Sequence, residues 1–174
     1  FPVIAYYKLM EGLKGVFPNE KDRSEHIIEK MLYMVELNPV NVRVCKKIFK
    51  ELDETASPNI FSGSFLSEDN KSVNLKVLEA FGIDKFDVIM GNPPFNAAQV
   101  FSDKKGGGDS LWPKFVEVSI DLLKPNKYLL FVHPAAWRKP ESEKSKTKGM
   151  FNLMAQKNSI KYLEIHNTKD GIET

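Results

Sequence analysis

The sequence has little cysteine, little histidine and no long apolar run. Its 174 residues include a single cysteine, Cys45, and three histidines, His26, His133 and His166. One cysteine excludes an intramolecular disulfide framework and a cysteine-rich metal site, and it is typical of a reducing compartment. The histidines have no spacing typical of a metal-ligand set, so we expect no bound metal. The chain also lacks a run of about 18 apolar residues and a signal-peptide pattern, so we expect a soluble cytoplasmic protein with no membrane partner.

The chain lacks an excess of either charge as well. Lys and Arg together number 25 and Asp and Glu 23, a net charge of +2. No global basic field therefore indicates a nucleic-acid binder, and any such contact has to be local. The apolar fraction of 42% is sufficient for the core of one domain. Because the chain opens at Phe1 without an initiator Met and stops at Thr174 just after a strand-like segment, we expect it to be a fragment of a longer protein.

Signals for strands and helices alternate along the chain. The polar segment 17–29 predicts a loop with at most one helical turn, and "KPNK" (124–127) predicts a turn. The glycine-rich segment and the highly charged segment predict loops. Apolar runs predict buried strands, and helical spacing with Asn or Pro caps predicts helices. The predicted strands are 31–36, 86–90, 128–132 and 160–167, together with a short strand that runs into a glycine turn within 59–66. The predicted helices are 2–13, 39–52, 111–123 and 150–157, and the predicted loops are 102–110 and 138–149.

The predicted helix 39–52 illustrates how the core is assigned. Asn38 is placed to cap it and Pro39 suits its first turn. Apolar residues recur at helical spacing along one side, which predicts the face that packs against the sheet. That face comprises Val40, Val44, Ile48 and Leu52, widened by Cys45 and Phe49.

Strands that alternate with helices and are apolar throughout predict a parallel α/β sheet with helices on both faces. In such sheets ligands bind beyond the carboxyl ends of the strands. The residues just after the apolar stretches that end at Val35, Phe61, Met90 and Val132 are therefore the candidates for a site. They are Glu36, Ser64-Phe65, Asn92-Pro93-Pro94-Phe95 and His133-Pro134.

The segment Asn92 to Phe95 is the most informative of these. Two prolines make the backbone stiff and hold the residue before them extended, so the Asn92 amide oxygen and the Pro93 carbonyl point in set directions. Two acceptors placed at the two N–H bonds of an amine on a heteroaromatic ring would localise its lone pair without a strong base. Phe95 adds a face on which a planar base can stack. A strand-end turn over a packed aromatic is the alternative, and the position after an apolar strand favours the chemical role.

Glu36 has two interpretations that the sequence leaves open. A carboxylate just past a strand of a nucleotide-binding sheet can accept hydrogen bonds from ribose hydroxyls. Alternatively, it is a solvated Glu near a helix start, where the helix dipole favours negative charge.

With these residues in view, the chain resembles the S-adenosylmethionine-dependent amino-methyltransferases with an Asn-Pro-Pro-Phe or Asn-Pro-Pro-Tyr motif. It is most similar to the adenine-N6 DNA methyltransferases of restriction–modification systems. The resemblance covers nearly the whole chain. The matching segments are "LYMVELNPVNVRVCKKIF", "NIFSGSFL", "FDVIMGNPPFN" and "LWPKFVEVSIDLLKPNKYLLFVHPAAWR".

The resemblance implies a Rossmann-like class I methyltransferase fold, base flipping and double-stranded DNA as the partner. It implies that Glu36 binds the cofactor ribose, Leu37 packs on its adenine, and Phe65 borders that pocket. Asn92 and Pro93 would hold the target amine, with Pro94 stiffening the turn and Phe95 stacking on the base. A restriction endonuclease or specificity module of the same system is a further implied partner.

Two positions depart from the family pattern. The glycine-rich loop that wraps the methionine part of the cofactor is absent, with Phe1 as its last residue, and Ser64 stands where an acidic residue usually holds the cofactor adenine. We therefore expect residues 1–174 to be a partial catalytic domain without its first strand. The target-recognition domain would lie beyond Thr174, and this piece alone would be inactive.

Other residues and functions stay open at this stage. Lys104 and Lys105 could contact phosphates beside the flipped base, or they could be solvated loop lysines. His133 is interpreted as a strand-end residue, and Trp112, Phe115 and Trp137 as packing residues. The same motif also serves methyltransferases that act on a protein glutamine or on guanine in ribosomal RNA. A non-catalytic nucleic-acid-binding subunit is the alternative from another class.

Overall fold

The computed structural model describes residues 1–96, 110–138, 145 and 147–166. It divides into two compact units, one made of Phe1–Gly91 and Val118–Leu130, the other of Asn92–Glu117 and Phe131–Thr174. Lys104, Lys105 and most of the two predicted loops at 102–110 and 138–149 lie outside the described residues. Within the described part, no helix is long and apolar enough to cross a membrane.

The first unit begins with three helical segments, α1 (Pro2–Gly12), α2 (Glu20–His26) and the π-helical η1 (Ile27–Met31). α1 follows the sequence prediction, with Pro2 in its first turn. The prediction of a loop at 17–29 was wrong. Asn19 caps α2 by accepting hydrogen bonds from the backbone N–H groups of Lys21 and Asp22 at 2.9 and 3.2 Å. The residues of α2 are polar or charged, and the apolar residues Ile27 and Ile28 that directly follow them in η1 are fully buried.

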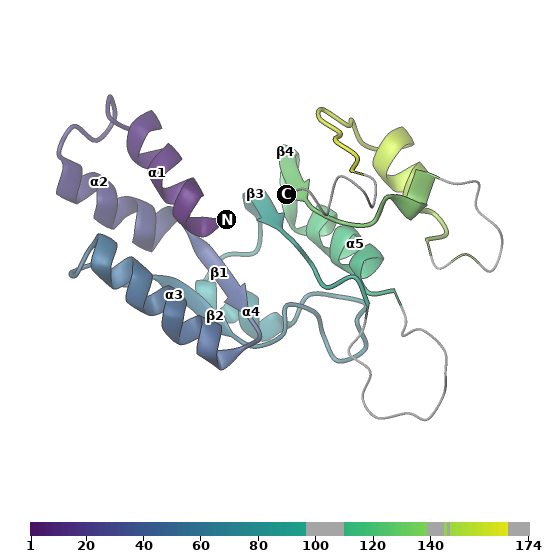
Figure 1. The fold of residues 1–174 in the computed structure, drawn as a ribbon, viewed down its shortest axis with the longest axis horizontal. Coiled ribbons are helices and arrows are strands. Elements are labelled where there is room, and N and C mark those ends of the chain that lie inside the picture. Colours follow the sequence, from purple (N-terminus) through teal and green to yellow (C-terminus); the bar gives the residue numbers. More distant parts are fainter. Residues whose placement is uncertain (97–109, 139–144, 146, 167–174) are drawn as a thin grey trace. The chain divides into compact units, whose positions relative to one another are not determined.

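A small parallel sheet follows, made of β1 (Tyr33–Glu36) and β2 (Asn59–Ser62). Tyr33 lies opposite Asn59 and Glu36 opposite Ser62, so both strands end at the same edge. Figure 1 shows α3 (Pro39–Leu52), the helix that connects them, lying alongside this sheet. The core between the helices and β1 contains the buried residues Tyr6, Ile27, Ile28, Leu32, Phe49 and Ala56.

α3 begins as predicted, because the Asn38 side chain accepts a hydrogen bond from the Val40 backbone N–H at 2.9 Å. The predicted core-facing side was wrong in part. The helix buries Val42 and Phe49, whereas Val40, Val44 and Ile48 are 52%, 51% and 39% exposed. α3 therefore has two apolar stripes on different sides, and the one that includes Phe49 packs into the core.

The first unit also contains α4 (Leu75–Phe81) and a second two-stranded sheet of β3 (Phe86–Gly91) and β4 (Leu123–Phe131). The Tyr33 ring joins β1 to this region through edge contacts with the Phe81 and Phe86 rings, at centroid distances of 5.2 and 6.2 Å. β3 confirms the predicted strand at 86–90.

The turn predicted at 124–127 was wrong, since β4 runs through it. Lys124 and Lys127 both form ion pairs with Asp87 on β3, at 2.7 and 2.9 Å. These pairs hold the start of β4 against the neighbouring strand, and Asn126 within it has a positive φ of 60°. One side of the sheet is open, because Val88, Met90, Tyr128 and Leu130 are all exposed.

The second unit contains the first half of α5 (Trp112–Leu122), the 3-10 segment η2 (Ala135–Arg138) and the π-helical η3 (Asn152–Gln156). Trp112, Trp137 and Met150 are buried within it, and the Trp137 ring lies 6.3 Å from the Phe151 ring. The sequence predictions of the helix over 111–123 and of Trp112 and Trp137 as packing residues are confirmed.

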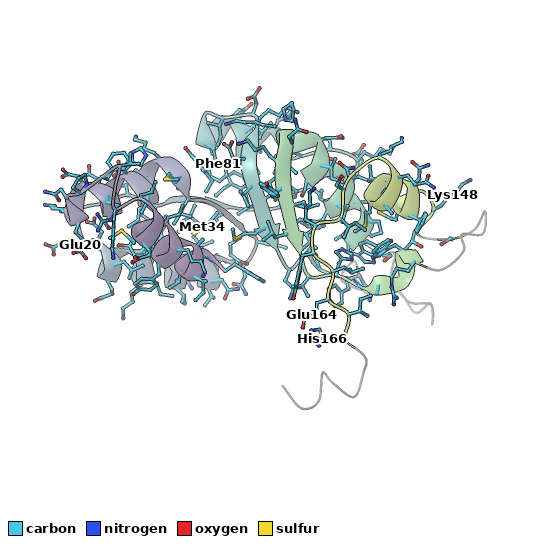
Figure 2. All side chains as sticks on the ribbon, turned by 90° about the horizontal axis from the view of Figure 1, so that it is seen from above. Glu20, Met34, Phe81, Lys148, Glu164 and His166 are labelled. Carbon is cyan, nitrogen blue, oxygen red and sulfur yellow. The ribbon has the colours of Figure 1, made fainter. Side chains whose placement is uncertain are left out.

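The strand predicted at 160–167 was wrong over its described residues, 160–166, which have no regular secondary structure. Tyr162 and Leu163 are 79% and 52% exposed, and the described part of the chain provides no strand that pairs with this segment. Figure 2 shows Glu164 beside His166 here, and the two side chains form an ion pair of 3.1 Å.

The architecture is thus mixed α/β with small sheets, which confirms the predicted class at this level. A single continuous Rossmann-like sheet stays a prediction.

Candidate active site

The carboxyl edge of the β1–β2 sheet holds the first group of predicted site residues. Glu36 is the last residue of β1 and is half-buried. Its Oε1 accepts a hydrogen bond from the Asn38 backbone N–H at 2.8 Å, which fixes the side chain beside the start of α3. Its main-chain oxygen accepts from the Gly63 N–H at 3.0 Å, so the end of β1 is joined to the turn after β2. Leu37, the next residue, is 71% exposed at this edge.

Ser64 and Phe65 continue from that turn. The Ser64 hydroxyl donates to the Leu66 carbonyl at 2.8 Å and is therefore engaged with its own loop. Asn74, the N-cap of α4, donates from its side chain to the Ser64 carbonyl at 3.1 Å and from its backbone to the Phe65 carbonyl at 2.9 Å. The loop is thus held in a defined conformation by a helix start. The structure therefore brings Glu36, Leu37, Ser64 and Phe65 to one edge, as parallel strands predict.

Phe1 is not joined to this edge. It occupies the N-cap of α1, its ring is 61% exposed, and its carbonyl accepts from the Ala5 N–H at 3.1 Å. None of the hydrogen bonds or ring contacts within the described residues links it to Glu36.

The segment Asn92 to Phe95 belongs to the second unit and directly follows β3. Pro93 is buried, whereas Asn92 and Pro94 are exposed and the Phe95 side chain is 43% exposed. Within the described part of the chain, the Asn92 side chain has no hydrogen-bond partner. The buried Pro93 therefore fixes the segment while the Asn92 amide and the Phe95 ring are available to a ligand.

A second connection holds this segment at its other end. The Phe95 carbonyl accepts hydrogen bonds from the Leu111 N–H at 3.0 Å and from the Ser110 hydroxyl at 3.5 Å. Asn96 and Ser110 form an isolated antiparallel bridge. The motif is thus attached to the residues that lead into α5.

A ring stack lies beside that connection. Trp112, the first residue of α5, is 1% exposed, and its ring is parallel to that of His133, with centroids 4.7 Å apart and planes 5° apart. His133 Nδ1 lies 3.0 Å from the Pro134 carbonyl oxygen. The sequence named both residues but did not predict that they stack on each other.

Sequence reasoning missed other supporting residues too. Asn74 had a recognisable signal, because an Asn before "LKVLEAF" is a typical helix N-cap. The backbone contacts of Gly63 and Leu111 had none, because they depend on the pairing of segments that are distant along the chain. Among the described residues, no cluster of three or more His, Cys, Asp or Glu side chains could hold a metal ion.

The mixed α/β architecture with a small parallel sheet fits a methyltransferase-like domain. The chain belongs to the Eco57I restriction-modification methylase family, whose sequence model matches residues 19–170.

A curated protein is also similar to the chain in sequence. It is a protein of Mycoplasma pneumoniae described as an uncharacterised adenine-specific methylase, 42% identical over 57 residues. The aligned region is 33% of this chain and 13% of that protein, so the chain matches only a small part of its relative.

Proposed function

We propose that this chain is part of the catalytic domain of an S-adenosylmethionine-dependent methyltransferase that methylates the N6 amine of adenine in DNA. The observation that carries the proposal is the segment after β3, in which a buried Pro93 presents the Asn92 amide and the Phe95 ring to solvent. Family membership supports methyl transfer within a restriction–modification system. The proposal includes a Rossmann-like sheet and a target-recognition function in another part of the full protein.

The edge of the β1–β2 sheet fits the cofactor. One carboxylate oxygen of Glu36 accepts from Asn38, and the other has no partner within the described residues, so it can accept from a ribose hydroxyl. Leu37 is exposed for apolar contact with an adenine ring, and Phe65 borders the same edge. Ser64, whose hydroxyl is engaged with Leu66, contributes its backbone rather than its side chain. Phe1 would bind the methionine portion, as an expectation from its place in the family pattern.

The segment Asn92–Phe95 (the clamp) would act on the target amine. S-adenosylmethionine, when bound, supplies a methyl group on a positively charged sulfur. The Asn92 side-chain oxygen and the Pro93 carbonyl would each accept one N–H of the amine, which turns the nitrogen lone pair toward the methyl group. Phe95 would stack on the extruded base, and Pro94 keeps the turn rigid. Both acceptors are weak bases, so the extra proton on the product nitrogen would leave to solvent.

Double-stranded DNA is the proposed partner, since an enzyme that modifies a base amine has to flip the base out of the duplex. Lys104 and Lys105 would contact the flanking phosphates, where lysines fix register without reading sequence. A restriction endonuclease or a specificity module would act with the full protein, as the family description suggests.

The substrate class is tested with the full-length protein and methyl-labelled cofactor. DNA, ribosomal RNA and a release-factor protein are incubated separately, and the nucleosides of the labelled DNA are analysed. We expect label in DNA as N6-methyladenine. Label found only in RNA or only in protein would show that this macromolecule, and not DNA, is the substrate. Binding without transfer to any of the three would indicate a non-catalytic subunit.

A further inference from the structure

We propose that His133 is a positioning residue that sets the orientation of the Asn92–Phe95 clamp through Trp112. This inference rests on the proposed function for its effect on catalysis. Its structural part concerns contacts within the second unit alone, so it can be tested without any methyl transfer.

The orientation of the His133 ring follows from its partner. A carbonyl oxygen can only accept a hydrogen bond, and the Pro134 carbonyl lies 3.0 Å from Nδ1. Nδ1 is therefore the donor to this carbonyl, and the hydrogen bond fixes the plane of the ring. The imidazole ring, two residues after the end of β4, is therefore held in one plane.

The His133 ring in turn defines the position of the Trp112 ring. The two rings are parallel within 5° at a centroid distance of 4.7 Å, and the indole is 1% exposed. Stacked aromatic pairs of this kind stabilise a structure beyond the area that they bury. Rotation of the buried indole would require the imidazole to move as well, so His133 limits the orientations open to the first residue of α5.

The residue before Trp112 holds the clamp. The Leu111 N–H donates to the Phe95 carbonyl at 3.0 Å, and Ser110 bridges Asn96. A change in the direction of Trp112 is therefore transmitted through one peptide unit to the carbonyl of Phe95, whose ring is proposed to stack on the target base. Because reacting groups are sensitive to misplacement by about 1 Å, such a shift lowers the rate of transfer rather than the affinity for the cofactor.

The structural part is tested by amide hydrogen exchange on the full-length protein. His133→Ala should increase exchange in the peptide that contains Leu111, because the stack that holds Trp112 is lost. His133→Phe keeps a flat ring and should retain most of the protection, whereas His133→Asn keeps a donor without the stack and should resemble the alanine variant. His166→Ala, which removes an exposed histidine of the same unit, serves as the control. Unchanged exchange at Leu111 in His133→Ala would overturn the inference.

The catalytic part is tested by steady-state kinetics on the same variants. For His133→Ala we expect kcat to fall about 10- to 100-fold, with KM for DNA and cofactor affinity within about threefold. His133→Phe should restore kcat to within about threefold of the parent enzyme. An unchanged kcat, an effect on KM alone, or no rescue by Phe would each refute the positioning role.

The two arms separate the two proposals. If the parent protein methylates nothing, the proposed function fails and the exchange arm still decides whether His133 holds the segment. If the parent methylates DNA and His133→Ala does so equally fast, only the present inference fails.

Discussion

At the scale of single residues, the clamp is defined by contrasting exposure. Pro93 is buried and cannot reorient, while its neighbour Asn92 has no partner among the described residues. An exposed amide without a protein partner costs little free energy of folding, because water satisfies its hydrogen bonds in the free protein. It is available for a ligand with two N–H bonds, which is the property that the proposed reaction requires.

Asp87 allows a prediction at the same scale. Its pKa is lowered from 3.8 to about 2, first by the hydrogen bond from Lys124 and then by that from Lys127. A depressed folded-state pKa means that the carboxylate stabilises the fold fully above about pH 4, and that this contribution is lost as the pH falls toward 2. An NMR titration should therefore give a midpoint near 2. Lys124→Ala should raise it toward 3.8, and Lys127→Ala should raise it less.

Because the Asp87 pairs are about half exposed, concentrated salt should also raise this midpoint. Lys76→Ala, which removes an exposed lysine from α4, is the control and should leave the titration unchanged. A midpoint near 3.8 in the parent protein would contradict the ion pairs that hold β4 to β3.

At the scale of elements, some boundaries could be predicted from the sequence and some could not. The start of α3 was predictable because Asn38 and Pro39 are a cap and a first-turn residue whose effect is local. α2 was missed because its seven residues are all charged or polar, and the apolar residues that anchor it lie in η1.

The buried side of α3 was assigned to the wrong stripe for a different reason. Val40, Val44 and Ile48 recur at helical spacing, and so do Val42 and Phe49. Spacing alone cannot select between two stripes, because the choice depends on which one meets Tyr6 and Leu32 in the folded unit. Residues 160–166 likewise include strand-favouring residues such as Ile160, Tyr162 and Ile165, but strand formation requires a pairing partner.

Gly82 allows a prediction about the end of α4. It adopts a left-handed conformation with a φ of +65°, and its N–H donates to the Leu78 carbonyl at 2.8 Å. An added Cβ would meet no atom within 4 Å, so Gly82→Ala carries only the backbone cost of about 1 kcal/mol. Denaturant unfolding followed by circular dichroism should show this loss in the full-length protein.

Gly15→Ala is the matched control for Gly82, since Gly15 also has no atom within 4 Å of an added Cβ and has no positive φ. We expect its effect to stay below about 0.5 kcal/mol. Equal losses for the two glycines would show that left-handed geometry does not end α4.

At the scale of the whole molecule, the sequence could predict only those parts of the site whose positions follow from the arrangement of the strands. Parallel strands place Glu36 and the Ser64–Phe65 turn at one edge, and the β1–β2 register with the Gly63–Glu36 hydrogen bond confirms this. Asn92 and Phe95 belong to the second unit, so a single rim that joins them to Glu36 stays a prediction. The supports of the clamp, at Leu111 and Trp112, could not be predicted because they arise from packing between distant segments.

In the proposed reaction, Asn92 holds the target amine during methyl transfer. The most direct test is the single-turnover rate of the full-length enzyme on DNA for Asn92→Ala and for Asn96→Ala, which removes the exposed side chain of the next asparagine and leaves its backbone bridge to Ser110 in place. We predict that Asn92→Ala lowers the rate roughly 100-fold or more with cofactor affinity within about threefold, and that Asn96→Ala stays close to the parent. An undiminished rate in Asn92→Ala would contradict the account.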